Sequence, residues 1–446
     1  MTAAAAAMDL ASLVAERAGA RKLHILAVTG SYAPDSTGIA PLNTELCEYL
    51  VACGHQVTVA TGLPHYPEWR VPETYRGRFG IREVRAGVSV RRHWIWVPAR
   101  RTPVRRIVFD TSVGVAAGLS GAAVGRIDVV LGISPPLQAG LAAWAIAKSR
   151  GVPLLLQIKD LVPDLAVSLG MLRNRAAIGF ARALERFLYR RADGILVICE
   201  GFREHILRAG VASERIAVVP DWVDTRFIRP DAPGQDFRRA HRLDREFVVL
   251  HIGNMGTKQK LDVALDAAAR LRAMEGAGPD GAANATICLA GDGADRARLE
   301  SLAQIRRLDN VRFLPLASRA DLPAMLAAAD LLLLSQSAAV RDSVIPSKLL
   351  TYLAAGRPVV AAAHGDSQAA LTLKRSGGGV VVPPENAASL AEAILQLRED
   401  SGARARHAQR GRAFAEEHFA REQVLARIES HVAVWAELGS WRARRA

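Results

Sequence analysis

Apolar runs alternate with loops and amphipathic segments through most of the chain. The first run, 23–28, is followed by a glycine-bearing loop, an expected helix at 39–52 and a second apolar run at 56–60. This order is a βαβ unit, which implies a parallel sheet. Four more buried strands are expected in the same sheet, at 129–133, 153–158, 194–198 and 216–219.

The alternation starts afresh at the apolar run 247–252, which a glycine-containing loop and a helix at about 261–272 follow. Later strands are expected at 286–290, 311–314, 331–334, 359–362 and 379–382. Three prolines between residues 220 and 233 mark a link between the two halves. The pattern therefore predicts an α/β protein with two tandem Rossmann-like domains, 21–225 and 240–415, and C-terminal helices at 416–446. Ligands of such sheets bind beyond the carboxyl ends of the strands, so we expect an interdomain cleft.

Composition fits a cytoplasmic protein with real cores. Half of the 446 residues are apolar, and the four cysteines have neither metal-ligand nor redox spacing. Residues 1–20 lack the basic start and compact apolar core of a secretory signal. The longest nearly uncharged stretch, 107–125, contains an aspartate and four glycines, so we predict no transmembrane segment.

Basic charge is concentrated in the first half of the chain. Residues 1–230 carry 29 Lys+Arg against 19 Asp+Glu, whereas the remainder carries 29 against 25. Such a surplus suits nucleic acid, anionic lipid or an acidic substrate, and a merely solvated arginine-rich surface is the open alternative. Because no nucleic-acid-binding motif is present, we expect no nucleic-acid partner.

The loop after the run 247–252 has the composition of a phosphate site. Gly253 and Gly256 would let backbone amides approach an anion at the start of the next helix, and Asn254 lies between them. Lys258 and Lys260 would neutralise a diphosphate. A tight turn with two exposed lysines is an equally open interpretation.

The stretch 346–360 is more specific. It predicts a helix that starts near Ser347, a candidate N-cap, and that ends at Gly356 before a buried strand. Lys348 and Thr351 would lie with Ser347 near the start of this helix, at the carboxyl end of the sheet. A purely structural helix, turn and strand is the alternative.

These two segments resemble glycosyltransferase family 4, of GT-B fold. The branch they resemble most contains colanic-acid-type fucosyltransferases and related exopolysaccharide and O-antigen transferases. Supporting segments lie at 64–67, 160–164, 219–224, 289–293 and 379–384, and the likeness covers residues 23–435. The resemblance implies transfer of a hexose from a GDP- or UDP-linked sugar to a lipid-linked saccharide, and the branch suggests fucose.

On the donor side, the resemblance implies that the loop 253–260 holds the diphosphate, although most members have arginine where Asn254 stands. Ser343 and Thr351 occupy the places of two family glutamates, the second of which grips the ribose. In the branch it resembles, Ser347 and Lys348 would take over diphosphate binding.

The segment 314–316, ending at Leu316, matches the part of the family that reads the base through its backbone, which leaves guanine and uracil open. Candidate acceptor-side residues are Asp35, Thr37, Gly38 and His65, although a lone loop histidine is more often incidental. Asp160 would take the proton of the acceptor hydroxyl. Asp164 is the competing carboxylate, with a helix N-cap as its alternative role.

No Asp-x-Asp pair occurs in the sequence, so no metal site is expected and the catalytic charge would come from Lys258, Lys348 and helix dipoles. No cofactor beyond the nucleotide-sugar co-substrate is expected. The resemblance implies retention of anomeric configuration, and front-face attack is expected because no nucleophile is evident.

Two arginine-bearing stretches predict peripheral contact with an anionic membrane, at the inner face of the plasma membrane. Arg100, Arg101, Arg105 and Arg106 precede the apolar run from residue 107, and six arginines bracket apolar residues in 173–191. An ordinary half-buried helix is the alternative for each stretch. Two other functions stay open: a sugar-nucleotide epimerase of similar fold, and a catalytically silent scaffold.

Overall fold

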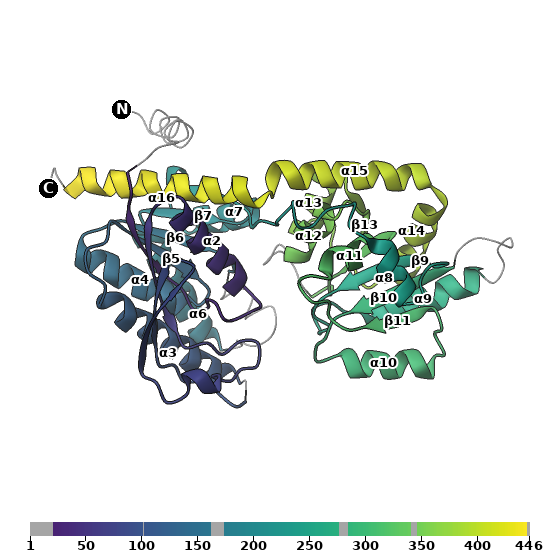
Figure 1. Cartoon of the computed structure of the whole chain (residues 1–446), viewed down its shortest axis with the longest axis horizontal. Coiled ribbons are helices and arrows are strands. Elements are labelled where there is room, and N and C mark those ends of the chain that lie inside the picture. Colours follow the sequence, from purple (N-terminus) through teal and green to yellow (C-terminus); the bar gives the residue numbers. More distant parts are fainter. Residues whose placement is uncertain (1–20, 101, 162–173, 276–283, 340–345, 444–446) are drawn as a thin grey trace. The chain divides into compact units, whose positions relative to one another are not determined.

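The computed structural model describes residues 21–100, 102–161, 174–275, 284–339 and 346–443. They fall into two compact units: the second is Trp222–Arg421, and the first comprises the chain up to Asp221 together with the chain from Glu422 onward. In Figure 1 the described parts of both units combine parallel strands with helices. The boundary lies four residues before the expected residue 225.

The first unit is built on an eight-stranded sheet with the order β3-β4-β2-β1-β5-β6-β7-β8. Its strands are β1 (His24–Val28), β2 (Gln56–Gly62), β3 (Gly80–Arg85), β4 (Val88–His93), β5 (Val129–Ser134), β6 (Leu154–Ile158), β7 (Gly194–Val197) and β8 (Ile216–Val218). All neighbours pair in parallel except β3 and β4, which form an antiparallel hairpin at one edge. This hairpin was not predicted from the sequence, because β3 alternates between exposed and half-buried residues and forms no apolar run.

The described helices of the first unit are α2 (Ala40–Ala52), α3 (Pro103–Ala122), α4 (Leu137–Arg150), α6 (Arg175–Arg191) and α7 (Glu200–Arg208). Side-chain caps begin two of them, where Thr102 and Asn174 accept backbone N–H groups. The last helix, α16 (Arg421–Ala443), returns to the first unit, where His55 bonds Glu429 at 3.1 Å. The C-terminal helices expected at 416–446 therefore divide between the two units at residue 421 and are not a separate unit.

The second unit has a six-stranded parallel sheet with the order β11-β10-β9-β12-β13-β14. Its strands are β9 (Phe247–Ile252), β10 (Ala285–Ala290), β11 (Val311–Leu314), β12 (Leu331–Ser335), β13 (Val359–Ala362) and β14 (Gly379–Val382). The strand order reverses between β9 and β12. Open α/β sheets bind ligands beyond the carboxyl ends of the strands at such a reversal.

Helices cover both faces of this sheet. They are α8 (Gly234–Ala240), α9 (Asp262–Glu275), α10 (Arg296–Ile305), α11 (Leu322–Ala327), α12 (Ser347–Ala354), α13 (Gln368–Ser376), α14 (Ala387–Glu399) and α15 (Ser401–His418). Alternate residues of each strand feed two separate cores: Val249 packs with α9 and α14, and Leu250 packs with α12 and α13. Burial on both faces explains why these strands read as continuous apolar runs.

Candidate functional site

Two glycine loops meet backbone to backbone at the carboxyl edge of the second sheet. The loop after β9 starts at Gly253, whose N–H donates to the Ala290 carbonyl at 2.8 Å, and the Met255 N–H donates to the Asp292 carbonyl at 2.8 Å. Gly291 has φ +140°, and a Cβ built on it would lie 1.9 Å from the Gly253 carbonyl oxygen. Only glycine permits this approach, so the loop after β10 fixes the shape of the predicted phosphate loop.

Lys348 lies directly against Gly253. A Cβ at Gly253 would lie 2.9 Å from Cε and 3.3 Å from Nζ of Lys348. Both residues are predicted from the sequence to bind the diphosphate, and the fold brings them together from segments almost one hundred residues apart. Space for the Lys348 side chain is therefore one reason for glycine at position 253.

The Lys348 ammonium has an unusual environment. Its Nζ lies 3.1 Å from Nε2 of His251 on β9, and no carboxylate contacts it among the described residues. Burial lowers the pKa of Lys348 to about 8. Burial, followed by the neighbouring lysine charge, lowers the pKa of His251 to about 3, so the imidazole is neutral at physiological pH.

The helix α12 begins as expected, but its cap was assigned wrongly. Pro346, in extended conformation, is the N-cap, and Ser347 is the first helical residue with no side-chain capping bond. The fixed φ of proline favours its place at the helix start. Ser347 is exposed, and the Thr351 hydroxyl donates to the Ser347 carbonyl at 3.4 Å, one turn further along.

Polar side chains close the rest of the loop after β9. Gln259 Oε1 accepts from the Gly256 N–H at 3.2 Å and from the exposed Asn254 side chain at 3.4 Å. This role of Gln259 was not predicted from the sequence, because a single glutamine before a helix carries no distinctive signal. Ser337, just beyond β12, donates its N–H to the Lys258 carbonyl at 2.7 Å, which ties the loops across the strand reversal.

The two lysines of this loop differ. Lys260 has φ +45°, and its Nζ lies 3.8 Å from a carboxylate oxygen of Asp262, which Arg298 also binds at 2.5 Å. No ion pair of Lys258 is found among the described residues. Lys258 is therefore better suited than Lys260 to meet an anion. Leu316, the candidate base-reading residue, lies two residues after β11 with 58 % of its surface exposed.

In the first unit, the candidate acceptor residues follow β1 and β2. Asp35 is buried and accepts from the N–H groups of His65 at 2.9 Å and Tyr66 at 3.1 Å. His65 is only 5 % exposed, and its ring lies 5.0 Å from that of Phe109. Burial raises the pKa of Asp35 and lowers that of His65. Through these contacts Asp35 and His65 hold two neighbouring loops together. For His65, this is the incidental role considered from the sequence.

Thr37 and Gly38 are exposed, and Gly38 has φ +68° beside the ring of Tyr66. Asp160 is half-buried just beyond β6. The preceding residue, Lys159, is buried and forms an ion pair with Asp221. Lys159 was not predicted from the sequence, although a lysine directly after a buried strand is a usable signal. Asp164, Ser343, Arg101 and Arg173 lie outside the described residues.

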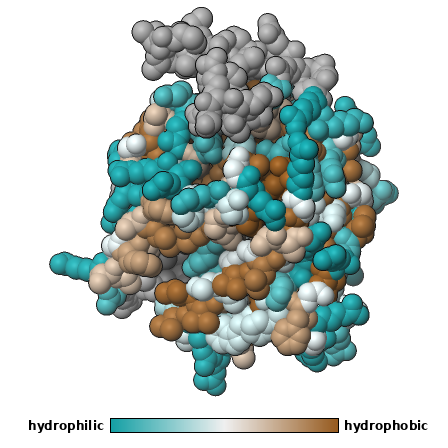
Figure 2. All heavy atoms as spheres, turned by 90° about the vertical axis from the view of Figure 1, so that its left-hand side faces the viewer, coloured by the Kyte–Doolittle hydropathy of each residue, from teal (hydrophilic) through white to brown (hydrophobic). Residues whose placement is uncertain are grey.

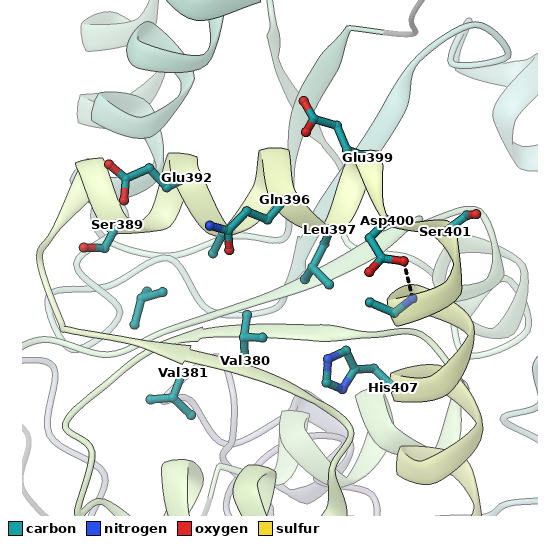
Figure 3. A pocket seen from close by; sticks show the side chains of 13 residues that line it. Val380, Val381, Ser389, Glu392, Gln396, Leu397, Glu399, Asp400, Ser401 and His407 are labelled. Atoms are coloured by element: carbon teal, nitrogen blue, oxygen red, sulfur yellow. Dashed lines mark hydrogen bonds between the residues drawn. The ribbon is translucent and has the colours of Figure 1, made fainter.

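A surface groove in the second unit lies away from these loops. It runs along the edge strand β14 between α14 and the start of α15 (Figure 3). Asp400 accepts from the Ala403 N–H at 2.7 Å, and His407 Nδ1 donates to the Gly377 carbonyl at 2.7 Å. Two of its polar side chains are thus engaged by the backbone. We assign no catalytic role to this groove.

Comparison with known proteins decides the family. Residues 37–222 match the glycosyl transferase 4-like domain, and residues 234–414 match glycosyl transferases group 1. A protein of Escherichia coli (strain K12), named as the colanic acid biosynthesis glycosyl transferase WcaI, is 31 % identical over 84 % of this chain and 92 % of its own length. The chain belongs to glycosyltransferase family 4.

Solved structures agree in fold. HepE of Anabaena, in complex with UDP-glucose, is 17 % identical and matches 92 % of this chain and 100 % of its own with a TM-score of 0.66. WaaG, a glycosyltransferase involved in lipopolysaccharide biosynthesis, is 16 % identical and matches 92 % of this chain and 99 % of its own with a TM-score of 0.64. The predicted GT-B architecture of two Rossmann-like domains is confirmed, and this glycosyltransferase is an enzyme of that fold.

Proposed function

We propose that this glycosyltransferase moves a hexose from a GDP- or UDP-linked sugar to a lipid-linked oligosaccharide in exopolysaccharide biosynthesis, with retention of configuration and without a metal or other cofactor. Fucose is the first sugar to test. The observation that carries the proposal is the Lys348 ammonium, which lies against Gly253 where the strand order reverses and has no carboxylate partner among the described residues. A nucleotide diphosphate supplies the missing negative charge.

In the proposed reaction, the bond between the anomeric carbon and the diphosphate oxygen breaks, and its electron pair leaves with the diphosphate. Lys348, Lys258 and the N-terminus of α12 stabilise this developing charge. The acceptor hydroxyl oxygen bonds the anomeric carbon from the side on which the diphosphate leaves. Its proton passes to a diphosphate oxygen or to Asp160, the carboxylate predicted as base.

The surface of helix α3 in the first unit supports peripheral binding at the inner face of an anionic membrane. Five large apolar residues on α3 are about half or more exposed: Val104, Ile107, Val108, Val115 and Leu119. They recur at helical spacing, whereas the other face of α3 is buried. Exposed Arg100 and Arg105 flank the start of the stripe. Helices with this character bind at lipid interfaces, and each arginine near anionic lipid contributes about 1 kcal/mol.

The second basic stretch is a weaker candidate. On α6, Leu188 is buried and the Phe187 ring packs 4.9 Å from that of Trp144 on α4, so this helix is largely an ordinary half-buried one. Its Phe180 remains 70 % exposed. Apolar side chains gather in patches among hydrophilic ones on the face of the molecule that Figure 2 shows. Across the described residues, we find no helix with the length and apolar character needed to cross a membrane.

The test is transfer to a lipid-linked acceptor from a panel of GDP- and UDP-sugars, with and without EDTA. We expect release of nucleoside diphosphate that depends on the acceptor and is unchanged by EDTA. Lys348→Ala should lower turnover by about 100-fold or more. Lys374→Ala, which removes an exposed lysine bonded to the Gly365 carbonyl, is the matched control and should leave turnover unchanged. Full activity of Lys348→Ala, or conversion of the donor without acceptor, would refute the proposal.

A further inference from the structure

His251 is the one polar residue of the buried strand β9, and it is fully buried. Burial of an imidazole is costly unless its nitrogens are hydrogen-bonded. Nδ1 lies 3.2 Å from the Leu333 carbonyl on the neighbouring strand β12, and Nε2 lies 3.1 Å from the Lys348 ammonium. A carbonyl only accepts and an ammonium only donates, so Nδ1 carries the proton and Nε2 is the acceptor. These two contacts favour the neutral tautomer that is protonated at Nδ1, and the ring also has a backbone hydrogen bond with Asn254.

A neutral acceptor is suited to an anion site. A carboxylate in the place of His251 would neutralise Lys348 and repel an incoming diphosphate. The imidazole instead occupies one N–H of the ammonium, which has three, and leaves its positive charge uncompensated. Since Lys348 also packs against Gly253, the imidazole and the glycine together restrict where the ammonium can point.

We propose that His251 is a positioning residue that holds the Lys348 ammonium toward the donor diphosphate without cancelling its charge. This inference rests on the proposed function, because it takes a nucleotide diphosphate as the ligand. In this arrangement Lys348, on α12, contacts the anion, and His251, on the central strand β9, orients the Lys348 side chain.

Lys348 should make diphosphate binding depend on pH. Its pKa of about 8 in the free protein rises when an anion binds beside it. The contribution of Lys348 to affinity is then constant below pH 8 and falls as pH rises further, by at most about tenfold per pH unit. Other titratable or charged groups at this edge are Tyr352, whose hydroxyl accepts from the Ile252 N–H, and the loop residues Asp292, Lys258 and Lys260.

The experiment measures the affinity of the full-length enzyme for UDP, GDP and inorganic pyrophosphate by calorimetry between pH 6.5 and 9.5. His251→Phe removes the acceptor while keeping a ring, and His251→Gln keeps an acceptor. We expect His251→Phe to weaken binding at pH 7 by about 10-fold or more, as loss of a hydrogen bond to a charged group does, and to move the pH midpoint downward. His251→Gln should restore part of both.

A double-mutant cycle separates positioning from structural support. If His251 acts through Lys348, then Lys348→Ala combined with His251→Phe should bind no more weakly than Lys348→Ala alone. Tyr352→Phe removes a neighbouring buried hydroxyl and should leave the pH midpoint in place. Additive losses, or a midpoint that His251→Phe does not move, overturn the role of His251 alone. If the wild type binds none of the three ligands, the proposed function is overturned, and this role of His251 with it.

Discussion

Gly291→Ala is the substitution whose effect on the free energy of unfolding follows most directly from the structure. The new Cβ would lie 1.9 Å from the Gly253 carbonyl oxygen, far inside contact distance, and φ +140° is a conformation that L residues rarely adopt. The backbone conformation alone costs about 1–3 kcal/mol. Separating the loops also breaks the bond from Gly253 to the Ala290 carbonyl and the 3.2 Å bond from Gly291 to the Leu314 carbonyl, at about 1 kcal/mol each. The expected loss is about 3–5 kcal/mol.

Urea unfolding followed by circular dichroism measures this loss, and calorimetry with UDP or GDP measures its effect on the site. In a unit of this size, the loss lowers the melting temperature by about 10 °C. Gly365→Ala is the matched control in the same unit, since Gly365 has ordinary φ and a Cβ there would contact only the Lys374 ammonium at 3.6 Å. We expect a change of about 0.5 kcal/mol or less for this control. A Gly291→Ala protein within about 1 kcal/mol of wild type would refute the packing argument.

Lys258→Ala should raise the KM for the nucleotide sugar by about 10-fold. Lys260→Ala should raise it less than about threefold, because the Lys260 ammonium already lies near the Asp262 carboxylate. Equal effects of the two substitutions in steady-state assays would contradict this ranking. Asp35→Ala should destabilise the first unit by about 2–4 kcal/mol in urea unfolding, because one buried and one partly buried N–H group lose their acceptor, and Asp35→Asn should cost less. A large loss of kcat in Asp35→Asn without loss of stability would instead favour a role at the acceptor. Ile107→Asp with Val115→Asp on α3 should reduce sedimentation with phosphatidylglycerol vesicles by about 10-fold, since each change removes an exposed apolar side chain and adds a repelled charge. Val84→Asp, at a site on β3 that is more exposed than either, is the control, and equal binding by both proteins would exclude α3 as the lipid-facing surface.

The sequence predicts the second unit well because its strands are buried on both faces. The expected strands 247–252, 311–314, 359–362 and 379–382 coincide with β9, β11, β13 and β14. Apolar continuity is a strong signal in such strands. The hairpin of β3 and β4 has one exposed face, is short and lies at the sheet edge, so its alternation was not distinctive enough to be recognised.

Site residues were predictable where a loop directly follows a buried strand or begins a helix. Gly253 and Lys348 were singled out in this way and are in contact in the structure, and their role toward a diphosphate stays a prediction. His251 and Gln259 were not found, since their roles depend on which atoms face each other in three dimensions. The N-cap of α12 was misassigned for a related reason, because serine has the stronger capping preference and only the backbone conformation at Pro346 shows where the helix begins.

The return of α16 to the first unit decides how this enzyme can be divided. Trp222–Arg421 is one uninterrupted stretch of chain, so a fragment with these bounds retains the whole second unit and is suited to testing the proposed nucleotide binding alone. The first unit is not continuous in sequence. A fragment that stops at Asp221 lacks the helix whose Trp435 packs against Gly194 of β7, and it leaves that part of the core open to water. The part of α16 from residue 422 to 443 must therefore be supplied, either as a separate peptide or through a linker, before the first unit can be examined in isolation.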